Sequence, residues 1–222
     1  MLSDLQIQNF VILYTDYALF AGFLLGCLAT RYRQMRPICF LLLITFINDQ
    51  IQSFIGFHYR LGVEDFHFYN PVQLVLLAWF FYENFEDGIL KRSVPIIAVA
   101  SVIFSIVNSC FIQTLHQYPT NFILVETFLL IVWSTLLFIE KLDAPPALNV
   151  FKDPAFITAV AILSFNLFSF IFFLLTNYFQ KHKINQFTSI YKILYFAVII
   201  YYGLLVIANI FSLKMIKSLD KN

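Results

Sequence analysis

The chain has 222 residues, of which 60% are hydrophobic and 12% charged, whereas soluble domains average about 45–50% apolar and about 25% charged residues. A chain of this length cannot bury so much apolar surface in a water-soluble core. The composition therefore excludes a soluble domain and makes the lipid bilayer the expected surroundings. The net charge is +1 and the Lys and Arg residues form no basic stripe, so we expect no nucleic-acid partner.

Seven apolar stretches follow one another along the chain, each close to the length of about 20 residues that crosses the hydrocarbon core. Charged residues, Pro and Gly separate them. We therefore predict an all-α polytopic integral membrane protein, in which residues 1–222 form a single seven-helix transmembrane domain. The expected spans are residues 8–29, 37–58, 68–85, 93–115, 120–140, 154–179 and 190–213.

The first span is expected to be a retained helix and not a cleaved signal peptide. No Lys or Arg precedes it, and Asp4 stands where a signal peptide carries its basic region. Pro37, Pro95 and Pro154 lie near the starts of the second, fourth and sixth spans, where a helix does not need the N–H that Pro lacks.

Two of the connections have distinctive compositions. The segment His58–Asn70 is rich in His and Tyr. Two interpretations stay open for it: a pH-sensitive lid, because His titrates near neutrality, or an aromatic belt at the membrane interface. The connection between the fifth and sixth spans is the longest, and Pro145-Pro146 excludes a helix there.

The two halves of the chain share a faint pattern. Asn9-Phe10 precedes Asp16 in the first span, and Asn121-Phe122 precedes Glu126 in the fifth. This spacing indicates a 3+1+3 parallel repeat, in which the fourth helix joins two triplets, as in some transporters.

The distribution of Lys and Arg sets the expected orientation, because cytoplasmic loops carry an excess of both. Ten fall on one side of the threaded helices and four on the other, which predicts an outside N-terminus and a cytoplasmic C-terminus. The ten are Arg31, Arg33, Arg36, Lys91, Arg92, Lys141, Lys152, Lys214, Lys217 and Lys221, and the four are Arg60, Lys181, Lys183 and Lys192.

Strongly polar side chains within the spans fall toward the outer side of the membrane. An Asp at the centre of a span costs about 2.5–3.5 kcal/mol on insertion scales, so intramembrane carboxyl groups are expected to face one another, water or a ligand. We predict that these side chains form a polar, ligand-binding cavity in the outer half of the bilayer. They are Asp16, Asn48, Asp49, Gln52, Asn70, Gln73, Glu126 and Asn166.

Interhelical hydrogen bonding is the alternative role for such residues. We favour it for Asn108, Asn209 and Gln50, and we favour ligand binding for Asp49 and Glu126. Both interpretations stay open for Asn48 with Gln52, and Asp16 is shallow enough to reach toward water.

The sequence holds no HExxH, GxSxG, GxGxxG or P-loop motif. Its four His residues have no metal-ligand spacing, and Cys27, Cys39 and Cys110 form no CxxC pattern. We therefore expect no cofactor, no metal site and no disulfide framework, and nothing in the sequence requires catalysis.

Several short motifs resemble a family of small seven-helix membrane proteins common in Bacteroidota. They are Phe68-Tyr69-Asn70 at the third span, Asp153-Pro154-Ala155-Phe156 at the sixth, and Asn48-Asp49-Gln50 in the second. This resemblance implies a bacterial inner-membrane location. A looser architectural similarity is to sugar-transporter and PQ-loop proteins, although Val72 separates Pro71 from Gln73 in this chain.

Three functions are expected from these features. The first is a ligand-sensing or signalling module that binds a small polar or cationic ligand and acts through a separate cytoplasmic or membrane protein partner. The second is a small-solute transporter, proton-coupled through Asp49 and Glu126. The third is a structural subunit of a membrane complex. An enzyme acting on a lipid or other membrane substrate ranks last, because the sequence offers no nucleophile–base pair and no metal site.

Overall fold

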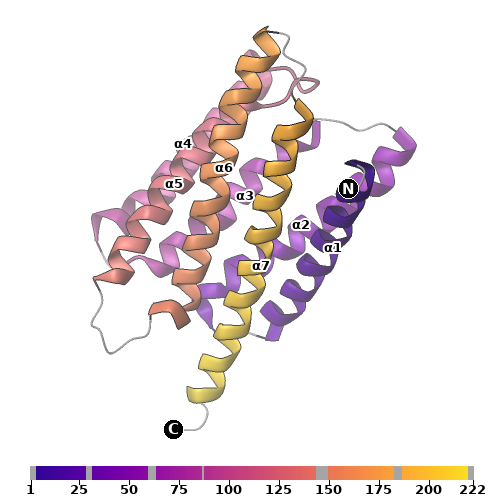
Figure 1. Ribbon diagram of the computed structural model, residues 1–222. Helices are drawn as coiled ribbons and strands as arrows, with labels where there is room; N and C mark the ends of the chain where they lie inside the picture. Colours follow the sequence, from indigo (N-terminus) through magenta and orange to yellow (C-terminus); the bar gives the residue numbers. More distant parts are fainter. Residues whose placement is uncertain are drawn as a thin grey trace.

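The computed structural model describes residues 4–28, 32–59, 64–86, 88–143, 150–182 and 187–219. Within these ranges the chain forms helices joined by short connections, without strands (Figure 1). The long helices are α1 (Asp4–Leu28), α2 (Arg36–Tyr59), α3 (Glu64–Asn84), α4 (Ile89–Val107), α5 (Thr120–Leu142), α6 (Pro154–His182) and α7 (Phe187–Leu219). Three short helical turns are η1 (Arg33–Met35), η2 (Asn108–Ile112) and η3 (Val150–Lys152).

Each of the seven apolar stretches coincides with one α-helix, but several helices are longer than expected. Helix α3 begins at Glu64 because its acidic first turn, Glu64 and Asp65, complements the positive end of the helix dipole. Helix α4 begins at Ile89, so Pro95 lies inside it.

Several of the Lys, Arg and Pro residues used above to predict the orientation and the connections lie outside the described residues. They are Arg31, Arg60, Pro145, Pro146, Lys183 and Lys221.

Four helical stretches in the described part of the chain are long and apolar enough to cross a membrane: Ile89–Ile112, Thr120–Leu142, Pro154–Leu175 and Phe196–Met215. A fifth, Leu13–Leu28, is apolar but shorter. The protein is therefore a helical, multi-pass membrane protein.

The helices pack as a ring. Consecutive helices are neighbours within the triplets α1–α2–α3 and α5–α6–α7, and contacts of α1 with α7 and of α3 with α5 close the ring. Helix α4 lies outside it, against α3 and α5. The ring has a two-fold pattern of neighbours. If α1, α2 and α3 change places with α5, α6 and α7, the contact of α1 with α7 becomes the contact of α5 with α3, and each ring neighbour stays a neighbour.

Two glycines let α1 approach α2 closely. A Cβ atom added to Gly22 would lie 3.0 Å from Cδ1 of Leu42, and one added to Gly26 would lie 3.0 Å from both Cβ and Sγ of Cys39. The Gly22-x-x-x-Gly26 spacing is a small-residue face, which membrane helices use for close packing. Asn209 of α7 joins the same contact, because its Nδ2 donates to the Gly22 carbonyl at 3.1 Å.

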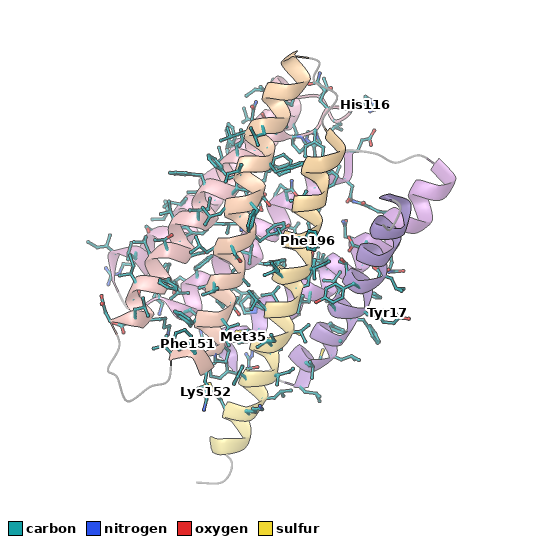
Figure 2. All side chains as sticks on the ribbon, in the orientation of Figure 1. Tyr17, Met35, His116, Phe151, Lys152 and Phe196 are labelled. Carbon is teal, nitrogen blue, oxygen red and sulfur yellow. The ribbon has the colours of Figure 1, made fainter. Side chains whose placement is uncertain are left out.

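One half of the ring is a dry apolar core. Ile38 and Leu42 of α2, Leu137 of α5, Ile162 of α6 and Leu205 of α7 are all 0% exposed. Met35, labelled near this end in Figure 2, is 1% exposed. Because no water penetrates such packing, any solvent-filled space in the ring lies in its other half.

Asp153 fixes the start of α6 at the dry end of the bundle. Its Oδ1 accepts the Ala155 N–H at 2.9 Å, as an N-cap does, and Pro154 follows as the first helical residue. Lys141 of α5 lies 3.5 Å from the second carboxylate oxygen. Burial, and to a smaller extent the Asp153 carboxylate, raises the pKa of the Tyr32 hydroxyl to about 12.

The close α1–α2 contact yields a stability prediction. Gly26→Val should lower the free energy of unfolding by about 1–3 kcal/mol, because the added atoms meet Cys39 backbone and Cβ atoms that cannot move aside. Gly88→Ala is the matched control, since an added Cβ there meets nothing within 4 Å. Thermal unfolding in nanodiscs measures both, and equal melting temperatures for the two variants would contradict the close contact.

Candidate functional site: a polar cavity inside the helix ring

A cavity of about 320 Å³ lies within the ring. Residues of α2, α3, α5, α6 and α7 line it, together with one residue of the α4–α5 connection. Helices α1 and α4 contribute none of the lining. The polar lining residues are Thr45, Asn48, Asp49, Gln52, Tyr69, Asn70, Gln73, Tyr118, Glu126, Thr127, Asn166, Ser169, Tyr201 and Tyr202.

The structure brings seven of the eight residues singled out in the sequence to this cavity: Asn48, Asp49, Gln52, Asn70, Gln73, Glu126 and Asn166. Asp16 is not among the lining residues, although its helix α1 contacts both α2 and α7. Its carboxylate still acts on Asp49 by Coulomb repulsion. Asp16 therefore influences the cavity charge from outside.

Glu126 is the most deeply buried acid of the cavity. Its side chain is 4% exposed, and its Oε1 has no hydrogen-bond partner in the described part of the chain. The nearby hydroxyl of Ser169 on α6 is also buried without a partner. An unsatisfied buried polar group costs about 1–3 kcal/mol. A ligand that forms hydrogen bonds with these two oxygen atoms would remove that cost.

A short hydrogen-bond chain fixes Tyr69 at the cavity wall. The Thr45 hydroxyl donates to the Leu41 carbonyl of its own helix at 2.8 Å. Its only proton is then used, so the Tyr69 hydroxyl must be the donor in the 2.6 Å bond with Thr45 Oγ1. This chain links α2 to α3 and orients the Tyr69 ring.

The cavity amides differ in how much of their capacity the protein uses. Gln52 Nε2 donates to Asp65 Oδ2 at 2.6 Å, so Gln52 both lines the cavity and joins α2 to α3. Asn166 Nδ2 donates to the Ile162 carbonyl one turn back in α6. Pro71 lies inside α3 and has no N–H to donate to the His67 carbonyl, so the helix lacks one backbone hydrogen bond beside Asn70.

Aromatic rings line the end of the cavity that lies nearest the α4–α5 connection. The Tyr118 ring lies 4.8 Å from Phe66 of α3 and 5.7 Å from Phe173 of α6, measured between ring centroids, and all three residues line the cavity. His116, two residues before Tyr118, marks this end of the bundle in Figure 2. The cavity therefore occupies the half of the ring opposite the dry core.

Amide and imidazole bonds hold the α4–α5 connection in place. Asn108, which is 0% exposed, donates to Gln113 Oε1 at 3.0 Å and accepts from Asn121 Nδ2 at 3.3 Å. His67 Nε2 donates to the Gln117 carbonyl at 2.8 Å, and its Nδ1 lies 2.7 Å from Ser109 Oγ. The interhelical hydrogen bonding expected of Asn108 and Asn209 is thus confirmed, by the bond of Asn108 to Asn121 of α5 and by the bond of Asn209 to the Gly22 carbonyl of α1.

The tyrosines of α7 were not among the residues expected at the cavity. Tyr201 and Tyr202 both line the cavity, and Tyr201 stacks on Phe165 of α6 with ring centroids 4.8 Å apart. A usable signal was present, since a Tyr in mid-helix must find a polar partner for its hydroxyl when it is buried.

The function of this cavity has to be inferred from its own residues. No family model, curated protein or solved structure matches the chain.

The Thr45–Tyr69 bond can be tested by removing the shared hydroxyl. Thr45→Val should lower the free energy of unfolding by about 1 kcal/mol, because the Tyr69 hydroxyl loses its acceptor. Thr135→Val is the control, since Thr135 also donates to the carbonyl four residues back but is exposed. Chemical denaturation in mixed micelles compares the two, and a Thr45 variant as stable as wild type would exclude a structural role for the bond.

Proposed function

We propose that this protein is a ligand-sensing or signalling membrane module whose ligand occupies the cavity of the helix ring. The observation that carries the proposal is the buried Glu126 carboxyl group, which lines the cavity and has an oxygen without a partner. A structural carboxyl group would be expected to have its oxygens bonded by the protein. Binding sites combine an apolar wall with a few convergent polar groups, as this cavity does.

The full proposal includes seven membrane spans with the N-terminus outside and the C-terminus in the cytoplasm. The bacterial inner membrane is the proposed location, in keeping with the resemblance to small Bacteroidota membrane proteins. The cavity then opens outward, and the dry core faces the cytoplasm. Because the cytoplasmic connections are short, a separate protein partner would receive the signal.

Neutralising Glu126 tests the proposal directly. Glu126→Gln should raise the free energy of unfolding at pH 7 by about 1 kcal/mol, because residues kept for function often reduce stability. Asp143→Asn removes an exposed carboxylate at the end of α5 and should leave stability unchanged. Thermal unfolding of purified protein in nanodiscs provides the comparison.

The opposite result has an equally clear meaning. A Glu126→Gln protein that unfolds at a lower temperature than wild type would identify the carboxyl group as a structural hydrogen-bonding partner. The protein would then be assigned as a scaffold or subunit of a membrane complex.

Transport of a small solute is the second candidate function. The observation that favours it is the two-fold pattern of helix neighbours, in which α1–α2–α3 and α5–α6–α7 exchange without altering the ring. Parallel repeats related in this way move against each other in some transporters. Such a movement would open the dry half of the ring to the cytoplasm.

Alternating access predicts that cysteines in the dry half become reactive in some state. Ala159→Cys on α6 and Leu42→Cys on α2 report on this, because both positions are 0% exposed. Each is introduced after replacing the native cysteines, and labelling by N-ethylmaleimide is followed over hours in vesicles. Transport predicts slow labelling of both, whereas lasting protection beside a labelled Asn48→Cys protein would reject transport and leave sensing.

A further inference from the structure

We infer that the ligand of the cavity is a small organic cation, with an ammonium group bound at Glu126, aromatic rings around it and the Asp49 carboxyl group in the same lining. This inference rests on the proposed ligand-binding function and names the chemistry of the ligand. It follows from three properties of the cavity: the sign of its charge, the unpaired oxygen of Glu126 and the arrangement of its rings.

The charge of the lining has one sign. Asp49 and Glu126 both contribute carboxyl groups, from α2 and α5, and the described lining residues include no Lys, Arg or His. Asp16 and Asp65 act on Asp49 with further negative charge. An anionic ligand would find no cationic side chain in this lining, whereas a cation would find carboxyl groups that can supply its counter-charge.

The Glu126 carboxyl group marks where the charge of the ligand would sit. Both Tyr69 and Tyr201 are close enough to interact with it electrostatically. Tyr69 does not donate its proton to Glu126, since that proton is used in the bond to Thr45. Glu126 Oε1 therefore stays available for a donor that comes from outside the described protein, which an ammonium group would be.

The surrounding rings suit an organic cation. Phe165, Tyr201 and Tyr202 form a continuous aromatic wall, with centroids 4.8 Å apart for the first pair and 5.0 Å for the second. Cations bind the faces of such rings with about 0.5–2 kcal/mol of attraction. Among the described residues no group of three or more His, Cys, Asp or Glu side chains gathers as a metal ion would need.

The size of the cavity limits the ligand. Pockets for small molecules range from about 300 to about 1,000 Å³, and this one, at about 320 Å³, lies at the lower end. A compact amine or quaternary ammonium ion fits this description better than a peptide or a lipid headgroup with its chains.

The test measures the charge preference of the cavity without knowing the natural ligand. Asn48→Cys places a thiol in the lining, in a protein whose Cys27, Cys39 and Cys110 are replaced by Ala. Its labelling rates with cationic trimethylammonioethyl methanethiosulfonate and with anionic sulfonatoethyl methanethiosulfonate are compared. Thr114→Cys, in the exposed part of the α4–α5 connection, gives the reference ratio for an unselective site.

A cation site predicts a cation-to-anion rate ratio at least about tenfold above the reference, because acidic cavities concentrate cations by this amount or more. Adding Asp49→Asn or Glu126→Gln should reduce the ratio severalfold, and adding Asp143→Asn, a carboxylate outside the cavity, should not. Circular dichroism and size-exclusion profiles matching those of the parent protein confirm that each variant is folded.

The other outcomes are distinct from one another. Labelling of Asn48→Cys at the reference ratio, or a preference that survives both neutralising variants, would overturn the cation assignment while leaving a ligand-accessible cavity. Failure of both reagents to react, while Thr114→Cys reacts normally, would mean that solutes do not reach the cavity. That result would overturn the proposed ligand-binding function together with the cation assignment.

Discussion

The cost of holding carboxyl and amide groups among apolar helices is the constraint on which the rest of this structure depends. Each such group must find a partner or water, and the ring of α1, α2, α3, α5, α6 and α7 provides both. Where the protein supplies partners, as Thr45 does for Tyr69, the groups join helices. Glu126 and Ser169 each have a buried oxygen without a partner among the described residues, and both line the cavity.

The same constraint divides the bundle along its length. In the dry half, Leu42, Leu137 and Ile162 exclude water and fix the distances between helices. In the other half, polar residues occupy positions that equally large apolar residues would fill. The dry half supplies rigidity, and the cavity half retains groups that a more stable protein would have replaced. Function, on this account, is concentrated where the packing is least complete.

The number and order of the helices, and the height of the cavity residues along the bundle, were accessible from the sequence. Hydropathy marked the seven segments, and alternating helix direction gave each polar residue a height along the bundle. Height alone brought seven of the eight candidates, from Asn48 to Asn166, to the cavity. The rotation of a helix about its own axis was not accessible where few polar residues mark one face. Helix α1 is such a case, because apolar residues cover most of its surface. Asp16 was therefore assigned to a cavity that its helix does not reach, and Tyr201 and Tyr202 were left out of a cavity that they line. The close α1–α2 contact was readable in principle, since Gly22 and Gly26 are four residues apart.

Helix α4 lines no part of the cavity, and much of its surface is exposed: Ile96 is 70% exposed and Val99 is 60% exposed. Its contribution is to the direction of the chain. Three antiparallel helices end at the face opposite to the one where they began. A second triplet joined directly to the first would therefore be inverted relative to it. One additional crossing returns the chain to the starting face. The sequence of α4 is thus constrained by length and lipid contact more than by side-chain chemistry, and it is the helix in which residues can change most freely without altering what the cavity recognises.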